Sequence, residues 1–144
     1  GIGSDEDETR TERDIPLLEA AVLAGHREAA GLLLRRFAGT GMRTTGYLYT
    51  TCIARHLGAA AALLDLPDEA RGYYQTALEV CREMPFRPEE ALTHLQLSEL
   101  LLDHYPDERA EALHHLDTAL AEFRDMKMQP SLERALRHRD ILGA

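Results

Sequence analysis

The stretch LPDEA at residues 66–70 leads into YYQTAL at residues 73–78, and a similar pair, YPDERA at 105–110 and LDTAL at 116–120, follows about forty residues later. Both copies place a proline and two acidic residues before a run of alanines and large apolar residues. Proline suits the first position of a helix, and acidic side chains in the first turn complement the helix macrodipole. Repetition at this spacing is typical of arrays of helix pairs, which build extended binding surfaces.

The composition favours an all-α fold. The chain has 144 residues with no Trp and few Val or Ile, whereas Ala, Leu, Glu and Arg, which favour helices, are abundant. Hydrophobic residues make up 44% and charged residues 28%, as in an ordinary soluble protein. A chain of this length hides roughly two thirds of its unfolded surface, so we expect one domain with a substantial core.

Charge and cysteine content indicate the cellular setting. The formal net charge of −9 disfavours attraction to nucleic acids or to an anionic membrane. The longest apolar run without a charge, residues 57–64, is far shorter than the roughly 20 residues of a membrane span, and the acidic N-terminus does not resemble a secretory signal. The two cysteines, Cys52 and Cys81, fit a reducing cytosol. We therefore expect a cytoplasmic protein without nucleic-acid or membrane partners.

Residues 1–14 differ in composition from the rest of the chain. They contain six acidic and two basic residues, a net charge of −4, and almost nothing apolar. Such a segment buries too little apolar surface to fold, so it is expected to be a disordered acidic tail or a linker to something upstream. Residues 15–144 are expected to form one helical repeat domain. Its predicted parts are helix pairs at 15–38, 47–84 and 88–128 and a capping helix at 131–142.

Glycine and proline mark the ends of the expected helices. Gly25 separates two short helices, and the glycines and threonines of residues 39–46 indicate a loop. Residues 47–64 are expected to form one long helix, and Pro88 begins a later one. That later helix is apolar on two sides, as expected for a helix between neighbours. The last helix has a polar outer face, which is typical of a terminal cap.

The helix pairs resemble tetratricopeptide repeats, whose motif combines small residues with aromatic or large apolar residues at fixed positions. The matching residues are Leu57, Gly58, Ala70, Tyr74 and Ala77 in one pair and, after a two-residue insertion, Leu97, Ser98, Ala112, Leu116 and Ala119 in the next. In the first pair Phe37 stands where a small residue is expected, and the usual Trp is matched nowhere. The resemblance implies a right-handed stack of antiparallel helix pairs, a tetratricopeptide-like α-solenoid of about seven helices.

The physical meaning of the motif can be stated for the pair at 47–84. Small residues at Gly58, Ala70 and Ala77 let two helices approach closely. The ring of Tyr74 then fills the space toward the following pair.

The stretch from Ile15 to Ala144 also resembles the C-terminal helical region of large bacterial regulators. The segments that carry this likeness are 54–60, 67–71 and 126–136. Such regulators place a nucleotidyl cyclase domain or a LuxR-type DNA-binding domain, together with a signal-transduction ATPase domain, ahead of tetratricopeptide-like repeats. The chain itself contains neither a phosphate-binding loop motif nor a Gly-rich dinucleotide fingerprint.

Histidine invites a metal hypothesis, because His94, His104, His114 and His115 lie in one third of the chain. Glu111 and His114 have the spacing of half a di-metal site in a helical bundle. Such a site needs a second Glu-x-x-His and further carboxylates, and the sequence has no second copy. We therefore expect no metal and no cofactor, and interpret these histidines as surface residues.

Cys52 and Cys81 lie about fourteen residues on either side of the turn at 65–68, so an antiparallel pair would place both at the same level, roughly 21 Å from the turn. They are either neighbours that could react or two small buried apolar side chains. The second interpretation suits a reducing compartment.

Catalytic residues are not expected. Ser98 occupies a repeat-packing position and Ser131 a helix start, while Asp68 and Glu69 suit a helix N-terminus. Two groups of basic residues are interpreted as solvated faces, because no aromatic residues interleave with them to stack on bases. They are Arg35, Arg36 and Arg43, and Arg134, Arg137, His138 and Arg139.

A partner-binding groove is expected on the concave side of the array, lined by the first helix of each pair. The repeat register assigns to it Cys52, Arg55, Ala59, Ala62, Leu95, Glu99, Leu102 and Asp103. In a short array the terminal helix could instead fold over this surface, which would turn the groove into core or dimer contact.

The leading hypothesis is a non-catalytic interaction module, the C-terminal part of a bacterial signalling or transcriptional regulator, which binds a protein or a neighbouring domain of the same polypeptide. The alternatives are a small-molecule-sensing helical domain, a stand-alone adaptor and a helical-bundle metalloenzyme. The sequence also allows a homodimer through exposed Leu or Tyr side chains.

Overall fold

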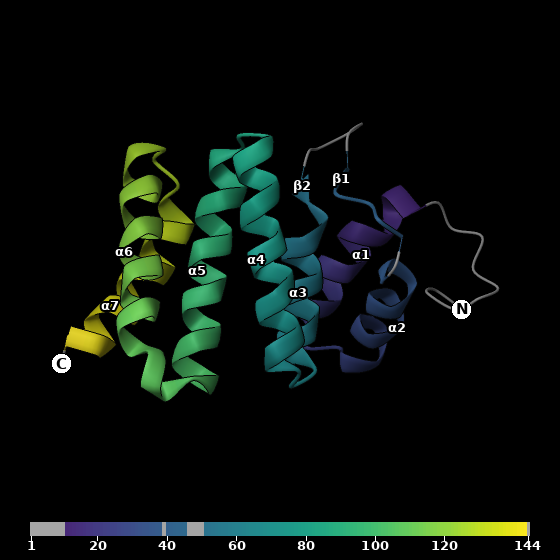
Figure 1. Ribbon diagram of the computed structural model, residues 1–144, viewed down its shortest axis with the longest axis horizontal. Helices are drawn as coiled ribbons and strands as arrows, with labels where there is room; N and C mark the ends of the chain where they lie inside the picture. The colour runs from purple at the N-terminus through teal and green to yellow at the C-terminus, as the bar shows by residue number, and fades with distance from the viewer. Residues whose placement is uncertain (1–10, 39, 46–50, 144) are drawn as a thin grey trace. The chain divides into compact units, whose positions relative to one another are not determined.

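The computed structural model describes residues 11–38, 40–45 and 51–143, which form seven α-helices and one short antiparallel sheet (Figure 1). The predicted all-α fold is confirmed, because each of the two strands is only two residues long. The chain divides into two compact units, residues 1–77 and 78–144, and the boundary falls inside α4 (Pro67–Glu83). Of the predicted tail at 1–14, residues 1–10 lie outside the described part of the chain.

The first unit contains α1 (Thr11–Leu23), α2 (Arg27–Phe37) and α3 (Ile53–Leu63), which contact one another, together with the first part of α4. Its buried apolar side chains include Ile15, Leu18, Ala30, Leu33, Phe37, Ile53 and Ala60. Gly25 lies between α1 and α2 with a φ of +66°, a conformation that glycine adopts without strain. The side chain of His26 then caps α2 by accepting a hydrogen bond from the Ala29 N–H. The predicted separation of two helices at Gly25 is confirmed.

Helix α1 begins at Thr11, inside the segment expected to be a tail. The carboxylate of Asp14 is fully buried, and its Oδ2 lies 2.8 Å from Nε of Arg36 on α2. A buried carboxylate costs free energy unless a cation compensates for its lost hydration, so this ion pair joins the start of α1 to α2. The sequence analysis assigned Asp14 to the tail because amino-acid composition shows the charge of a segment but not the ion pairs that its residues form.

The start of α3 also differs from the helix expected at 47–64, of which residues 47–50 lie outside the described part. Thr51–Cys52 (β2) pairs antiparallel with Thr44–Thr45 (β1), and Thr44 lies opposite Cys52. The Ile53 N–H donates to the carbonyl of Arg43 at 3.0 Å, and α3 begins only at Ile53. The helix prediction was therefore wrong at Thr51 and Cys52, because β-branched threonines favour extended backbone.

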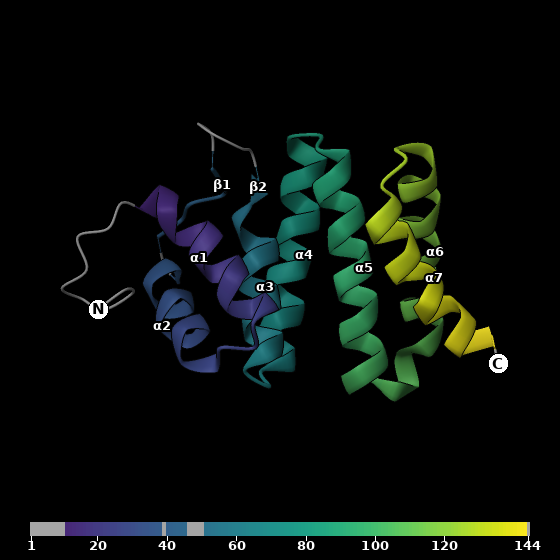
Figure 2. The ribbon, with the colours of Figure 1, turned by 180° about the vertical axis from the view of Figure 1, so that it is seen from behind.

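The second unit contains the end of α4, α5 (Arg87–His104), a turn of 3-10 helix (Pro106–Glu108), α6 (Arg109–Asp125) and α7 (Gln129–Gly143). Helix α5 packs along α6, and α7 packs against α6 on the side seen from behind (Figure 2). The core that these helices share consists of Ala91, Leu95, Leu116, Ala119, Leu120, Phe123 and Ala135. Pro88 lies in the first turn of α5, as predicted.

Helix α5 is buried on both of the sides that the sequence marked as apolar. Leu95 lies in the core shared with α6, and Leu97, Leu100 and Leu101 are buried as well. This burial agrees with a helix covered on two sides. In the described part of the chain, none of the helices has the length and apolar character that crossing a bilayer requires.

Candidate functional site

The groove residues predicted for the first unit lie on α3 and just before it. Cys52 and Arg55 are buried, whereas Ala59 and Ala62 are partly exposed. Nη2 of Arg55 lies 3.3 Å from Nε2 of His56, and Oγ1 of Thr51 lies 2.7 Å from the same nitrogen. A guanidinium can only donate, whereas the hydroxyl of Thr51 can donate to Nε2 or accept from it. Arg55 thus binds inside the unit instead of presenting its charge to a partner.

The groove residues predicted for the second unit lie on α5. Leu95 is buried in the core, Glu99 and Leu102 are partly exposed, and Asp103 is exposed. The end of α5, with Leu102 and Asp103, therefore offers the most surface. The groove as a whole draws on residues of both units and stays a prediction.

Glu99 binds two side chains of α7. Its Oε2 accepts a hydrogen bond from Nη2 of Arg134 at 2.8 Å and lies 3.2 Å from Nε2 of His138. Nearby, Nε of Arg139 lies 3.2 Å from Oδ1 of Asp117 on α6. Three of the four basic residues of α7 interpreted above as a solvated face, Arg134, His138 and Arg139, thus attach α7 to α5 and α6, whereas Arg137 is exposed. A last helix that contacts a groove residue is the arrangement named above as the alternative to an open groove.

The residues matched to the tetratricopeptide motif are all buried. They are Leu57, Gly58, Ala70, Tyr74, Ala77, Leu97, Ser98, Ala112, Leu116 and Ala119. A Cβ atom added to Gly58 would lie 2.6 Å from Cε1 of Tyr74, so this approach requires glycine. The buried hydroxyl of Ser98 donates to the carbonyl of Leu95 at 2.7 Å. Small buried residues are what any close helix pair needs, and the tetratricopeptide identity stays a prediction.

Two histidines meet between α5 and α6, a contact that the sequence analysis missed. Nδ1 of His94 lies 2.8 Å from Nδ1 of His115, and Nε2 of His115 lies 3.7 Å from Oε1 of Glu111. Burial, and then the neighbouring His115, lower the pKa of His94 to about 4. Glu111 therefore lies beside His115 rather than completing a half-site with His114. Among the described residues, no group of three or more His, Cys, Asp or Glu side chains is placed to hold a metal ion.

Both cysteines are buried thiols. Cys52 and Cys81 are 1% and 3% exposed, so they pack as small apolar side chains. This burial favours the second of the two interpretations drawn from the sequence.

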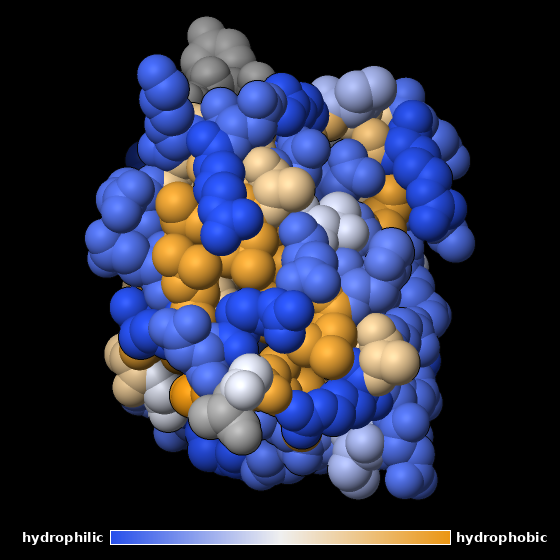
Figure 3. All heavy atoms as spheres, turned by 90° about the vertical axis from the view of Figure 1, so that its left-hand side faces the viewer, coloured by the Kyte–Doolittle hydropathy of each residue, from blue (hydrophilic) through white to orange (hydrophobic). Residues whose placement is uncertain are grey.

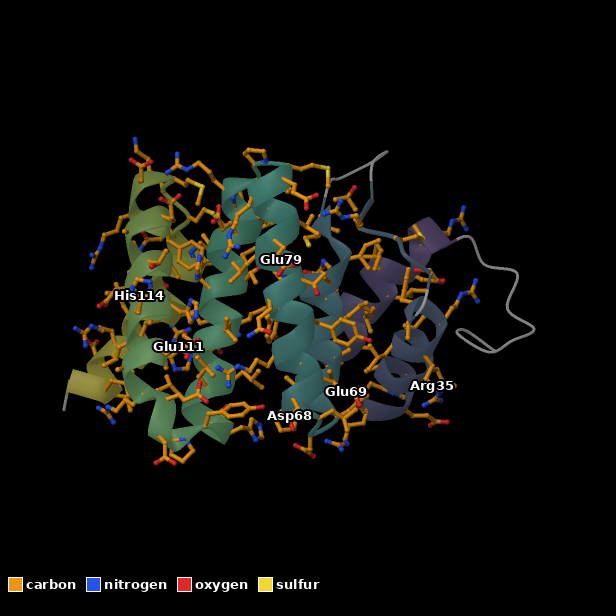
Figure 4. All side chains as sticks on the ribbon, viewed as in Figure 1. Arg35, Asp68, Glu69, Glu79, Glu111 and His114 are labelled. Carbon is orange, nitrogen blue, oxygen red and sulfur yellow. The ribbon has the colours of Figure 1, made fainter. Side chains whose placement is uncertain are left out.

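The acidic residues considered for catalysis have structural positions. Asp68 and Glu69 lie in the first turn of α4 (Figure 4), where negative charge complements the helix dipole. Glu111 and His114 lie on α6, one turn apart (Figure 4). His114 is exposed, and its ring centroid is 5.9 Å from that of His115.

Apolar side chains gather on the surface formed by α6 and α7, between hydrophilic ones (Figure 3). Ile141 on α7 is 73% exposed, and Leu132, Leu136 and Leu142 of the same helix are only partly buried. The three leucines pack against the core of the second unit, so Ile141 is the largely exposed one of the four, and we call the surface around it the α7 apolar face. Apart from Ile141, the exposed residues of this helix include Glu133, Arg137, Arg139 and Asp140, which agrees with the polar outer face expected from the sequence.

No family model matches the chain, and no curated protein or solved structure matches it. The class that the structure defines is an all-α protein of two compact helical units.

Proposed function

We propose that the chain is a non-catalytic protein-binding module and a regulatory part of a larger bacterial signalling or transcriptional regulator. The observation that carries this proposal is the α7 apolar face, on which Ile141 is 73% exposed. Apolar surface that gathers in one place on a folded protein typically marks a binding site. Covering it stabilises a complex by about 25 cal/mol for each Å² removed from water.

The proposed partner is a neighbouring domain of the same polypeptide, in the cytoplasm. The resemblance to the helical regions of bacterial regulators favours this partner over an unrelated protein. In such contacts, apolar anchors supply affinity and flanking charges set the register. Arg137 and Asp140, both exposed, flank Ile141 and can take that second role.

The proposal can be tested with the adjoining domain that the same reading frame encodes. That domain is expressed separately and titrated with this chain by isothermal calorimetry. Ile141→Asp should weaken binding at least tenfold, because a charge then replaces the apolar anchor, and the melting temperature should stay unchanged. Leu23→Asp is the matched control: Leu23 is 80% exposed on α1 in the other unit, and the variant should bind as the wild type does.

Two outcomes would overturn the proposal. A reading frame that encodes no further domain would exclude the regulatory role within one polypeptide. Equal affinity of the Ile141→Asp variant and the wild type would show that the α7 apolar face is not the contact surface.

A further inference from the structure

The contact between His94 and His115 requires a single proton between their two Nδ1 atoms. Their Nδ1 atoms lie 2.8 Å apart, which is hydrogen-bond distance. Two unprotonated nitrogens at this distance would point lone pair at lone pair, and two protonated ones would point proton at proton. One ring therefore donates through Nδ1–H and the other accepts.

Glu111 indicates which ring donates at neutral pH. Its Oε1 lies 3.7 Å from Nε2 of His115, which favours a proton on that nitrogen. His115 with its proton on Nε2 has a free lone pair on Nδ1, so His94 is the donor in the neutral pair. Protonation of one ring leaves the hydrogen bond in place, because the ring with two protons donates through its Nδ1 and the other ring accepts. The hydrogen bond is lost only when His94 is protonated at Nδ1 as well.

The surroundings of His94 oppose that second proton. Arg82 on α4 and His114 and His115 on α6 all disfavour a positive His94, whereas Glu122 on α6 favours it. Glu122 is itself bound by Arg87, with its Oε2 2.8 Å from Nε of that residue. Glu122, the carboxylate that favours a charged His94, is thus already paired with a cation.

We propose that His94 and His115 form a proton-sensitive clasp between α5 and α6, closed near neutral pH and opened by acid, so that the α5–α6 pair loosens as pH falls. The histidines link the two helices that share the core of the second unit. Loss of the clasp therefore acts on the helix pair that carries α7. This inference does not depend on the proposed partner, because it concerns the chain alone.

The direction of the pH effect follows from the His94 pKa. In the unfolded chain the pKa of a histidine is about 6.5, and in the folded protein that of His94 is about 4. Between these pH values His94 binds a proton in the unfolded state but not in the folded state. The stabilisation that neutral His94 provides is therefore fully present above pH 6.5 and is lost progressively as pH falls toward 4.

The first experiment is nuclear magnetic resonance on the full chain labelled with ¹⁵N. At pH 7.5 a scalar coupling between the two Nδ1 nuclei should appear across the hydrogen bond. It should persist through the first protonation and disappear in acid, when amide exchange at Leu95 and Leu116 should accelerate at least tenfold relative to amides of α1 and α2. Absence of the coupling at pH 7.5, with both rings titrating as free histidines, would overturn the proposal.

A pair of variants gives an independent test. His94→Leu should flatten the dependence of the melting temperature on pH between 7 and 4.5, because the variant lacks the imidazole whose pKa is lowered by folding. His104→Gln is the matched control on the same helix, since His104 is exposed, and it should keep the wild-type slope. Equal slopes for His94→Leu and the wild type would contradict the clasp.

Discussion

Gly58→Ala tests how closely α3 and α4 approach in the first unit. Alanine normally stabilises a helix interior relative to glycine by roughly 1 kcal/mol. At Gly58, however, the new Cβ would lie 2.6 Å from Cε1, 2.7 Å from Cδ1 and 3.0 Å from Cζ of Tyr74. The methyl group and the ring cannot both keep their places, so a change that usually stabilises should destabilise here.

The magnitude follows from how freely Tyr74 can move. Its side chain is 2% exposed, so the ring cannot swing into solvent, and any shift disturbs the surrounding core. Inserting a methyl group into a filled core costs roughly 1–3 kcal/mol. The propensity gain of alanine, roughly 1 kcal/mol, offsets part of this cost, and we expect a net loss of up to about 2 kcal/mol. For a chain of this size, that loss corresponds to a melting temperature lower by up to about 6 °C.

Two other helical glycines provide matched controls. A Cβ at Gly31 on α2 would lie 3.6 Å from Nη1 of Arg35 and 3.7 Å from Cδ1 of Leu64, which is ordinary contact. A Cβ at Gly72 on α4 would meet nothing within 4 Å. Gly31→Ala and Gly72→Ala should each stabilise the protein by up to about 1 kcal/mol. Urea unfolding followed by circular dichroism measures all three variants on one scale.

A double-mutant cycle isolates the contact with the ring. In a Tyr74→Leu background, the cost of Gly58→Ala should fall by at least about 1 kcal/mol, because the atoms that clash are absent. A Gly58→Ala variant as stable as Gly72→Ala would refute the close approach of α3 and α4. An unchanged cost in the Tyr74→Leu background would show that the cost arises elsewhere.

Two further changes test the ion pair of the first unit and a turn of the second. Asp14→Asn removes the buried charge beside Arg36 and should lower the free energy of unfolding by about 2–3 kcal/mol, whereas Asp117→Asn, in the exposed pair with Arg139, should cost less than about 1 kcal/mol. Equal urea midpoints for the two variants would contradict the role of Asp14. Lys127→Gly should stabilise the turn before α7 by up to about 1 kcal/mol, because Lys127 has a φ of +56°. A lower urea midpoint for Lys127→Gly would count against strain at this turn.

Helix ends could be predicted from the sequence because their signals act locally. Pro67 begins α4, Pro88 lies in the first turn of α5, and Gly25 separates α1 from α2, as expected. Each residue restricts its own backbone or that of its neighbour, whatever the rest of the chain does. These restrictions explain why the helical elements were anticipated before any contact between them was known.

Contacts between distant segments could not be predicted in the same way. The pairing of Thr44 with Cys52 converts an expected helix start into a strand, and only the partner strand reveals it. The His94–His115 contact depends on the register of α5 against α6, two helices joined through the 3-10 turn at Pro106–Glu108. By residue count from the turn, His94 and His115 lie at different levels along the α5–α6 pair. The residue count therefore does not predict their contact.

Glu99 shows why the proposed contact surface is the α7 apolar face and not the predicted groove. A partner that used Glu99 would have to replace the hydrogen bond from Arg134 and the contact with His138. A hydrogen bond to a charged group contributes roughly 1.5–3 kcal/mol, so a partner gains affinity at Glu99 only if it offers an equally good donor. Ile141 is largely exposed and requires no such exchange. The ion pairs that attach α7 to α5 thus make the groove costly to occupy, and they hold in place the helix that carries Ile141.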